Sequence, residues 1–379
     1  MTRVAMLAHS PLPRGGVVHA MSLSEALTAL GCEAVLHAPD ATGAGFFRRA
    51  ACATRAFPVA LAPPDTTQMV AQRIADYAAW LRREANRGYD VYHAHDGISG
   101  AALAQLKRER LIDGFVRTVH HLDAFADPRL NAWQDASIRE ADALLVVSEL
   151  WRRRLREEFG RDAAHSGNGV DLTRYSPARG GEDALRARLR LGDGPVFLAV
   201  GGVEARKNTR AMLQAFDLLL REAPGARFVI AGGASLLDHS AYQAEFRADL
   251  AAMGERTAAV VLTGPVADAE MPALYRLATA LVFASLKEGF GLCVLEAMAS
   301  GTPVVVSRTA PFTEYLSEGD ALFCDPYDPA SIAAAMRAAM QPDEARRARG
   351  FAIAARQGWD AVARRNLALY HRLREPALA

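Results

Sequence analysis

The stretch "LKEGFGLCVLEAMASGTPVV", residues 286–305, places two carboxylates around a glycine turn. The turn is Gly289-Phe290-Gly291, with Glu288 before it and Glu296 after it. The apolar run over 281–284 predicts a strand, and the pattern after the turn predicts a helix. In open parallel sheets, ligands bind beyond the carboxyl ends of the strands, often at such a glycine turn. Its backbone N–H groups and the helix dipole favour an anion, so the stretch predicts a diphosphate site.

The two glutamates would repel a diphosphate unless they bind something else. An ionised carboxylate only accepts hydrogen bonds, and a vicinal diol offers it two hydroxyl donors. Glu288 and Glu296 therefore indicate a sugar on each side of the diphosphate, as in a nucleotide-sugar with its ribose and its hexose. A single glutamate in the first turn of a helix is common without any ligand, so the interpretation depends on the pair and its surroundings.

Short apolar runs alternate with helical segments along the whole chain, which is typical of βαβ units and a parallel sheet. The pattern occurs twice, and 379 residues exceed what one hydrophobic core usually supports. The predicted strands are 4–8, 34–36, 91–93, 115–119, 144–147, 196–200, 228–231, 260–262, 281–284, 304–306 and 321–324. Helices are predicted between them, for example over 20–30, 72–87 and 210–221.

The segment 168–186 is rich in turn-forming residues and predicts a domain boundary near Ser176. We therefore expect an amino-terminal Rossmann-like domain over 1–176 and a second one over 177–357. The closing segment, 358–379, has the apolar face of a helix, which would either pack as an ordinary core helix or cross back to the first domain.

Bulk composition excludes several classes of protein. Lys and Arg number 44 against 43 Asp and Glu, so no overall charge favours nucleic acid or an acidic membrane. The four cysteines lie far apart, which argues against a zinc ribbon or a disulfide framework. The first residues lack the apolar core of a signal peptide, and no apolar run is long enough to span a membrane. We expect a cytoplasmic protein with at most a peripheral membrane contact.

The full spelling E-G-F-G-L-x-x-L-E-A-M-A-x-G-x-P-V, from Glu288 to Val304, resembles the E-x7-E signature of the family 4 retaining glycosyltransferases. This resemblance implies the GT-B fold, in which two Rossmann-like, doubly wound α/β domains with parallel sheets face each other across a cleft. Further segments resemble other elements of that family in the same order: "HSPLPRGG", "YDVYHAHDGISG", "TVHHLDAF", "NGVD", "GGVEARKN", "TGPVADAEMPALY" and "ALFCDPYDPASIAAAM".

The resemblance assigns roles on the nucleotide-sugar side. It implies that Glu288 contacts hydroxyls of the donor hexose and that Glu296 holds the ribose diol. The turn at Gly289 would present backbone N–H groups to the sugar and the diphosphate, from Phe290, Gly291 and Leu292. Base selection would lie around Gly264 and Val266 and in the loop after Gly232.

The phosphate-binding turn departs from the family pattern at one position. The resemblance leads us to expect an arginine where this sequence has Gly202, and a lysine where it has Lys207. Arg206 is the nearest candidate to replace the missing guanidinium, although "EARKN" is also the composition of an ordinary solvated turn. If Arg206 points away, the departing diphosphate would depend on Lys207 and a helix dipole alone.

Histidines mark the other domain. By resemblance His120 lies near the donor hexose and the reaction centre, with His121 as the fallback if the register slips. Asp96, His95 and the loop at Gly15 and Gly16 would line the acceptor side. His93 and His95 have a spacing that suits a metal, but without a clear third ligand a zinc site is disfavoured.

The sequence has no D-x-D triplet, the usual sign of a divalent metal at a nucleotide diphosphate. Fixed cations must then balance the charge of the leaving group, so we expect no metal and no cofactor. The family implies retention of anomeric configuration by front-face attack of the acceptor. The function predicted is hexose transfer from a UDP- or GDP-linked sugar to the hydroxyl of an unidentified acceptor, which is a small molecule, a glycan or a lipid-linked acceptor.

Other functions remain open to different degrees. A nucleotide-dependent oxidoreductase is disfavoured, because neither half opens with G-x-G-x-x-G and a later ribose-binding acid. Epimerases and phosphorylases of the same fold are disfavoured by the E-x7-E spelling and by the absence of a pyridoxal lysine motif. A non-catalytic module that binds a nucleotide-sugar is the main alternative, because Gly202 replaces an expected arginine.

Overall fold

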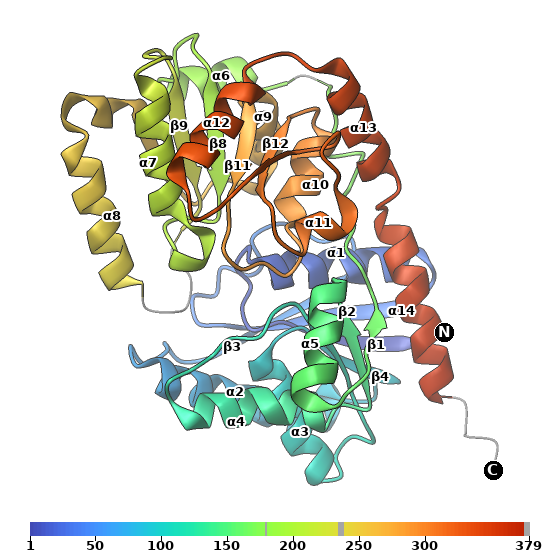
Figure 1. Ribbon diagram of the computed structural model, residues 1–379. Coiled ribbons are helices and arrows are strands. Elements are labelled where there is room, and N and C mark those ends of the chain that lie inside the picture. The colour runs from blue at the N-terminus through green and yellow to red at the C-terminus, as the bar shows by residue number, and fades with distance from the viewer. Residues whose placement is uncertain (179, 234–238, 375–379) are drawn as a thin grey trace. The chain divides into compact units, whose positions relative to one another are not determined.

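The computed structural model describes residues 1–178, 180–233 and 239–374, and the chain divides into two compact units (Figure 1). Unit 1 contains Met1–Gly169 together with the segment that begins at Trp359, and unit 2 is Val170–Gly358. The helices and strands of each unit are described separately below.

Unit 1 is built on a parallel sheet in the order β3-β2-β1-β4-β5-β6-β7. Its inner strands are almost completely buried, because helices cover both faces. This burial matches the apolar sequences of β1 and β6, whereas β4 and β5 also bury the polar residues His93, Arg117 and Thr118. The strands are β1 (Arg3–Leu7), β2 (Glu33–Asp40), β3 (Ala53–Pro58), β4 (Val91–Ala94), β5 (Val116–Val119), β6 (Ala143–Val146) and β7 (Ala164–His165).

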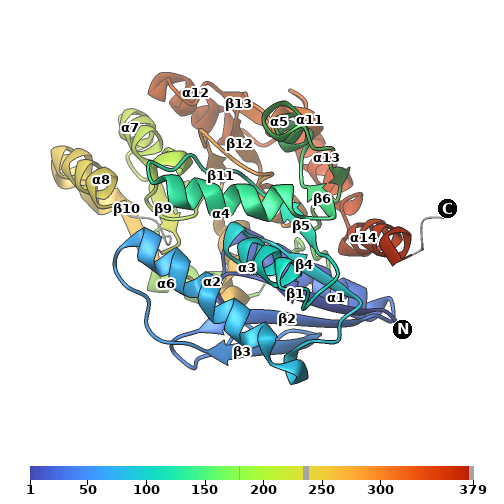
Figure 2. The same cartoon turned by 90° about the horizontal axis from the view of Figure 1, so that it is seen from below.

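Two groups of helices pack on the two faces of this sheet. One face is covered by α1 (Gly15–Ala29) and α14 (Trp359–Arg374). The opposite face is covered by α2 (Thr66–Arg82), α3 (Gly97–Arg108), α4 (Pro128–Arg139) and α5 (Glu149–Phe159), and a short 3-10 turn, η1 (Glu84–Asn86), follows α2. Figure 2 shows α2, α3 and α4 running side by side over the sheet. Unit 1 is therefore a three-layer α/β sandwich.

Unit 2 has the same architecture with the strand order β10-β9-β8-β11-β12-β13, all parallel. The first strand of each unit thus lies inside its sheet, and the chain continues to one side of it and then to the other. This order creates a switch point beside β1 and beside β8, where ligands of doubly wound folds bind. The strands are β8 (Val196–Val200), β9 (Arg227–Ala231), β10 (Val260–Gly264), β11 (Ala280–Phe283), β12 (Val304–Ser307) and β13 (Leu322–Cys324).

The helices of unit 2 also form two layers. One layer contains α7 (Thr209–Leu220), α8 (Ser240–Ala252) and α12 (Pro329–Ala339) (Figure 1). These helices pack on the sheet through a core that includes several phenylalanines. The other contains α6 (Glu182–Arg188), α9 (Met271–Leu277), α10 (Leu292–Ala299) and α13 (Glu344–Ala355). The remaining short turns are η2 (Ala205–Lys207), η3 (Gly254–Ala259), η4 (Asp268–Glu270) and α11 (Phe312–Tyr315).

All the predicted strands are present and, except for β2, they begin and end within two residues of the predicted positions. The prediction missed β3 and β7 altogether. The helix predicted over 72–87 is displaced, because Asp65 caps the helix by accepting a hydrogen bond from the Gln68 backbone, and the helix ends at Arg82. The helix predicted over 20–30 starts earlier, at Gly15.

The predicted domain boundary near Ser176 lies too far along the chain. Residues 170–176 belong to unit 2, because the Val170 backbone N–H bonds the Gln357 carbonyl at 2.8 Å and Arg174 pairs with Asp268 at 2.8 Å. The helix after Gly358 belongs to unit 1, in which the Arg365 guanidinium donates to the Ser166 carbonyl at 2.9 Å. No helix in the described ranges is long and apolar enough to cross a membrane.

Candidate functional site

The loops after β8 and β11 leave the sheet of unit 2 side by side at its carboxyl edge. The first loop carries Gly201, Gly202 and the turn η2, and the second carries Glu288 and leads into α10. The Leu286 and Lys287 backbone N–H groups both donate to the Arg206 carbonyl, at 2.9 and 3.4 Å, so main-chain hydrogen bonds connect the two loops. The segments predicted to bind the diphosphate and the hexose therefore form one surface.

Glu288, from the loop after β11, contacts two cations of the loop after β8. Its Oε1 lies 2.5 Å from Lys207 Nζ and 3.3 Å from Arg206 Nη1. Arg206 also pairs with Glu204 through its Nε at 3.2 Å, and Glu204 is only 1% exposed. The Arg206 guanidinium therefore lies in the cluster and does not point away from it. The cluster contains two cations and two carboxylates, all held at the switch point beside β8.

Glycine at two positions lets this cluster form. A Cβ on Gly201 would lie 2.8 Å from Lys207 Cε, so the Lys207 side chain can pack here only because residue 201 has no side chain. A Cβ on Gly202 would lie 2.7 Å from the Gly233 carbonyl oxygen, and Gly202 has a φ of +75°. An arginine at position 202 would meet the neighbouring glycine turn in this conformation. The backbone seen here thus suits glycine at position 202, and a guanidinium reaches Glu288 from Arg206 of η2.

The turn predicted to bind phosphate leads into the amino-terminal end of α10. Gly291 precedes this helix with a φ of +95°, and a Cβ there would lie 2.9 Å from the Phe312 ring. The Phe290 ring stacks on Tyr315 at 4.6 Å, and the Tyr315 hydroxyl donates to the Phe290 carbonyl at 3.2 Å. Packing from α11 therefore fixes the turn, and the first N–H groups of α10, starting at Leu292, lie next to Glu288 in the chain.

Glu296 follows Glu288 along the chain, lies on α10 and belongs to a second polar group. The Tyr275 hydroxyl donates a hydrogen bond to its carboxylate at 2.6 Å. A hydrogen bond from Tyr175 and the positive charge of Arg174 also stabilise the ionised carboxylate. Burial raises the pKa of Glu296 above its ordinary value, although the bond from Tyr275 and the charge of Arg174 act in the opposite direction. Its surroundings can hold a carboxylate in place as an acceptor for a diol.

The sequence interpretation missed Tyr175, Tyr275, Arg174 and Glu204. Tyr275 ends the quoted segment "TGPVADAEMPALY", and Arg174 and Tyr175 follow "NGVD", but nothing in the local spelling relates them to Glu296. They meet it only because residues 170–176 pack back on unit 2, where the Tyr175 and Tyr275 rings are 5.8 Å apart. Only the fold brings these positions together.

The residues predicted to read the base lie beside the glycine turns. The Gly232 backbone N–H bonds the Gly264 carbonyl at 2.9 Å, and Gly233 lies against Pro265. Val266 follows and is half-buried. The loop predicted after Gly232 falls, over residues 234–238, outside the described residues.

In unit 1, Gly16 and the histidines predicted for the acceptor side and the reaction centre come together beside β1. A Cβ on Gly16 would lie 3.3 Å from the His120 ring and 3.6 Å from the His95 carbonyl, whereas Gly15 has open space. His95 Nδ1 lies 3.2 Å from His120 Nε2. His121 points elsewhere, since it pairs with Asp123 at 3.2 Å and is largely exposed. The structure thus places His120, and not its neighbour, beside the glycine loop.

Asp96 caps α3 by accepting a hydrogen bond from the Ser99 backbone at 2.8 Å, and its other oxygen lies 3.7 Å from His9. Burial acts to raise the pKa of Asp96, but the interactions with His9, Arg117 and Ser99 together lower it. Arg117 is 3% exposed, and burial lowers its pKa to about 10. The acceptor-side residues therefore include a half-buried carboxylate that interacts electrostatically with a buried cation.

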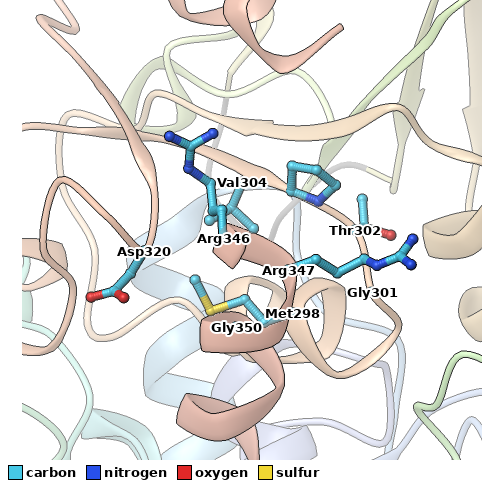
Figure 3. Close-up of a pocket in the computed structure, with 9 residues that line it drawn as sticks. Met298, Gly301, Thr302, Val304, Asp320, Arg346, Arg347 and Gly350 are labelled. Atoms are coloured by element: carbon cyan, nitrogen blue, oxygen red, sulfur yellow. The ribbon is translucent and has the colours of Figure 1, made fainter. Parts of the chain in front are cut away.

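Two cavities of unit 2 lie at the opposite edge of its sheet, near Pro303 and the start of β12. The smaller has a volume of about 10 Å³, enough for about one water molecule, and Figure 3 shows that Arg346 and Arg347 of α13 point in different directions around it. The larger, about 720 Å³, is lined by Glu182, Arg276 and Arg347 among others. Ligands of doubly wound sheets bind at the carboxyl edge, so neither cavity is the predicted site.

Two family models match the chain: "Glycosyltransferase Family 4" over residues 13–174 and "Glycosyl transferases group 1" over residues 182–356. A D-inositol 3-phosphate glycosyltransferase of Kineococcus radiotolerans is 33% identical over 76% of this chain and 73% of its own length. The protein of the same name from Acidothermus cellulolyticus is 32% identical over 82% and 74%.

Solved structures of low sequence identity have the same fold. Sucrose-phosphate synthase of Thermosynechococcus elongatus superposes with a TM-score of 0.79 at 22% identity, over 98% of this chain and 99% of that one. Anabaena HepE in complex with UDP-glucose has a TM-score of 0.79 at 16% identity, over 98% and 100%. These likenesses extend over both units.

Proposed function

Because this chain belongs to glycosyltransferase family 4, with a group 1 glycosyltransferase domain over residues 182–356, and is thus an enzyme that uses a nucleotide-sugar donor, we propose that it is a metal-independent, retaining hexosyltransferase. The proposed donor is a UDP- or GDP-linked hexose. The observation that carries the proposal is the contact of Glu288 with both Lys207 and Arg206 at the switch point of unit 2. It combines a carboxylate for sugar hydroxyls with cations for a diphosphate.

The cations have a role in the chemical step. As the bond from the sugar to the diphosphate breaks, negative charge grows on the leaving phosphate oxygen. Lys207 and Arg206 would stabilise that charge, together with the N–H groups at the start of α10. Glu288 keeps Lys207 in place at 2.5 Å before the donor arrives, so little reorganisation is needed. This arrangement supports catalysis by fixed charge, without a divalent metal.

Glu296 would accept hydrogen bonds from the ribose diol, and Glu288 from hydroxyls of the hexose. In front-face attack, the acceptor hydroxyl approaches on the side of the leaving group, and the departing phosphate oxygen takes its proton. The hexose is then transferred with its anomeric configuration retained. His120 would lie near the hexose, and Gly16, His95 and Asp96 near the acceptor.

The acceptor proposed is a small hydroxylated molecule. The relatives are named for D-inositol 3-phosphate and the similar structures include a sucrose-phosphate synthase, which makes a phosphorylated polyol the first class to test.

The donor is tested by thermal unfolding of the full chain with UDP-, GDP- and ADP-sugars. A ligand that binds only the folded state at about 100 times its Kd stabilises it by about 2.7 kcal/mol, so one base should raise Tm and the others should not. Turnover of that donor is then measured with D-inositol 3-phosphate and with other sugar phosphates, in EDTA and with added Mg²⁺ or Mn²⁺. Transfer that is unchanged by EDTA supports the proposal, and transfer that requires a metal contradicts metal independence.

The catalytic role of the cluster is tested with Glu288→Gln. We expect kcat to fall about 100-fold, because a carboxylate that orients the hexose and a cation is lost. Glu222→Gln is the matched control, since Glu222 makes an exposed pair with Arg337. If Glu288→Gln bound donor and transferred sugar as fast as the wild type, the assignment would be wrong. A chain that binds donor but neither transfers nor hydrolyses it would instead be a non-catalytic binding module.

A further inference from the structure

Three histidines of unit 1, two of them buried and one half-buried, lie close together. His19 comes from α1, His95 follows β4 and His120 follows β5. One ring nitrogen of each lies within 4.8 Å of one nitrogen of each of the others. His19 and His95 are 0% and 3% exposed, while His120 is half-buried and gives the group access to solvent. Three imidazoles with an open fourth position are a common ligand set for Zn²⁺ and similar ions.

The hydrogen bond of His19 fixes which of its nitrogens is available. Asn168 Oδ1 accepts a hydrogen bond from His19 Nδ1 at 2.7 Å, so Nδ1 carries the proton. Nε2 of His19 then has a free lone pair, and this buried nitrogen has no hydrogen-bond partner. A ligand histidine is usually oriented in this way, by an acceptor on the nitrogen that does not face the metal.

His95 and His120 are already placed like two ligands of one ion. The His95 Nδ1 and His120 Nε2 atoms are hydrogen-bonded at 3.2 Å, close to the separation of about 3.4 Å between two nitrogens on one tetrahedral zinc. A bound ion would take the place of the proton between them. A nitrogen of His19 lies within 4.8 Å of one nitrogen of each of the other two rings, so the rings must move closer together to bind one ion.

His93, which has the metal-like spacing with His95, is not part of this group. Its Nδ1 bonds the Tyr370 hydroxyl at 2.6 Å and its Nε2 bonds the Thr118 hydroxyl at 2.7 Å. Both ring nitrogens are therefore occupied. The two ligands that join His95 come from α1 and from the end of β5.

The charges near the group allow a cation. Arg117 is close enough to lower the pKa of His95 and His120, but its own charge is countered by Asp96. Burial is the main cause that lowers the pKa of His19 to about 4 and those of His95 and His120 well below their ordinary value.

We propose that His19, His95 and His120 form a binding site for one divalent transition metal ion of the Zn²⁺ or Co²⁺ class, with Asn168 positioning His19. The site belongs to unit 1, whereas the cluster at Glu288 belongs to unit 2, and the metal is not needed for the departure of the diphosphate. The site can exist whether or not the proposed hexose transfer is correct.

The test uses Co²⁺ as a spectroscopic probe of the full chain after treatment with a chelator. We expect one equivalent of Co²⁺ to bind and to give the visible absorption of tetrahedral or five-coordinate cobalt, and Zn²⁺ to displace it. His19→Gln should weaken binding at least 10-fold, because a ligand nitrogen is lost. Asn168→Ala should weaken it about 10-fold to 100-fold by releasing the His19 ring.

His371→Ala is the matched control, since this exposed histidine lies on α14 and is not one of the three. Thermal unfolding of each variant without metal shows whether it is folded. If His19→Gln does not fold, Asn168→Ala still tests the site, because it keeps all three ligand histidines. The proposal is overturned if only the octahedral, water-like spectrum of Co²⁺ appears. Equal affinities of the wild type, His19→Gln and Asn168→Ala would overturn it as well.

The site has a consequence for transfer that depends on the proposed function. If His120 faces the donor hexose, Zn²⁺ bound to it should inhibit transfer, and EDTA should restore the rate. Inhibition that is lost in His371→Ala but kept in Asn168→Ala would contradict the site. Stoichiometric cobalt binding without any inhibition would support the metal site and would contradict the role of His120 in transfer.

Discussion

Arg206 is the residue that we propose as a substitute for the arginine absent from position 202. It lies on η2, and its guanidinium contacts the Glu288 carboxylate at 3.3 Å. The cluster therefore contains a guanidinium although position 202, where the family pattern has arginine, is glycine. Arg206→Ala should reduce kcat about 10-fold to 100-fold, because one preorganised cation is removed from the leaving group. The steady-state rate with the identified donor measures this. Arg337→Ala, which breaks an exposed pair with Glu222, should leave the rate unchanged.

Restoring an arginine at position 202 should not improve the enzyme. The backbone there has a φ of +75°, and a Cβ would lie 2.7 Å from the Gly233 carbonyl oxygen. Gly202→Arg should therefore lower the free energy of unfolding by about 3 kcal/mol, from backbone strain and a steric clash. In urea unfolding, Gly254→Arg isolates the strain, since Gly254 has a φ of +61° and nothing within 4 Å of its Cβ. Equal losses in the two variants would contradict the clash.

Burial of Glu296 makes the stability of the ligand-free protein depend on pH. Burial raises its pKa in the folded state, so the folded state holds the proton more tightly than the unfolded state does. The resulting stabilisation is complete below the pKa of the unfolded chain and is lost as pH rises through the folded-state pKa. Glu296→Gln should raise the Tm of the ligand-free protein at pH 7, and the gain should shrink toward pH 4.

The same variant should bind the donor more weakly, because the amide offers one acceptor oxygen to the ribose diol in place of two. Tm measured with and without donor at several pH values separates the two effects. A lower Tm for ligand-free Glu296→Gln at pH 7 would show that Tyr275 and Arg174 outweigh the cost of burial.

Local spelling could predict Glu288 and Lys207, because each belongs to a motif with a glycine turn beside it. It also predicted Arg206 as the substitute cation, and the structure places that guanidinium against Glu288. It could not predict that His19 would join His95 and His120, since a lone histidine inside a helix has no distinctive neighbours. Contacts between residues distant in sequence depend on packing, which one sequence does not display.

At the scale of elements, α14 is held to unit 1 by a buried polar contact as well as by its apolar face. The Tyr370 hydroxyl bonds His93 Nδ1 at 2.6 Å, and both residues are 0% exposed. Tyr370→Phe should lower the free energy of unfolding of unit 1 by about 1 to 3 kcal/mol, because it leaves a buried nitrogen unpaired. Urea unfolding measures the loss, and Tyr327→Phe, which is 77% exposed in the wild type, should show none.

The predictability of a strand followed its burial. The inner strands were found because helices on both faces demand continuous apolar runs such as that of β8. The edge strand β3 was missed because its residues are exposed except Phe57, so its sequence resembles a loop. With only two residues, β7 is too short to show any periodicity. Such strands form through pairing with the neighbouring strands β2 and β6, and their own sequences give no clear pattern from which to predict them.

At the scale of the whole molecule, the two units differ in how the chain builds them. Unit 2 is one continuous segment, and its phenylalanine-rich core contains only its own residues. Unit 1 is discontinuous, since one of its two cores needs α14, with Val362 and Tyr370, from beyond unit 2. The repeated βαβ pattern predicted two such units, but their boundaries depend on contacts at Val170 and Trp359 that composition does not reveal.

We therefore expect the segment 170–358 to fold alone and to bind the donor with an affinity within about 10-fold of that of the full chain, if donor contacts lie mainly on Glu288, Glu296 and Lys207. The segment 1–169 alone should lack a cooperative unfolding transition, because part of the apolar core around α1 would be exposed to water. Circular dichroism and calorimetry on the two segments provide the measurement. A stable, cooperative 1–169 segment would show that α14 is dispensable.

The placement of α14 also matters while the protein is being made. Ribosomes extend a chain from its amino-terminal end, and domains usually fold in that order. Here the first domain to emerge cannot complete its packing until the last helix has been synthesised, after all of unit 2. The apolar surface of α1 therefore stays exposed in the nascent chain until α14 has been synthesised. During that time chaperones can bind this surface, or the chain can aggregate through it. Truncation near the carboxyl end would thus damage the half of the enzyme that was translated first.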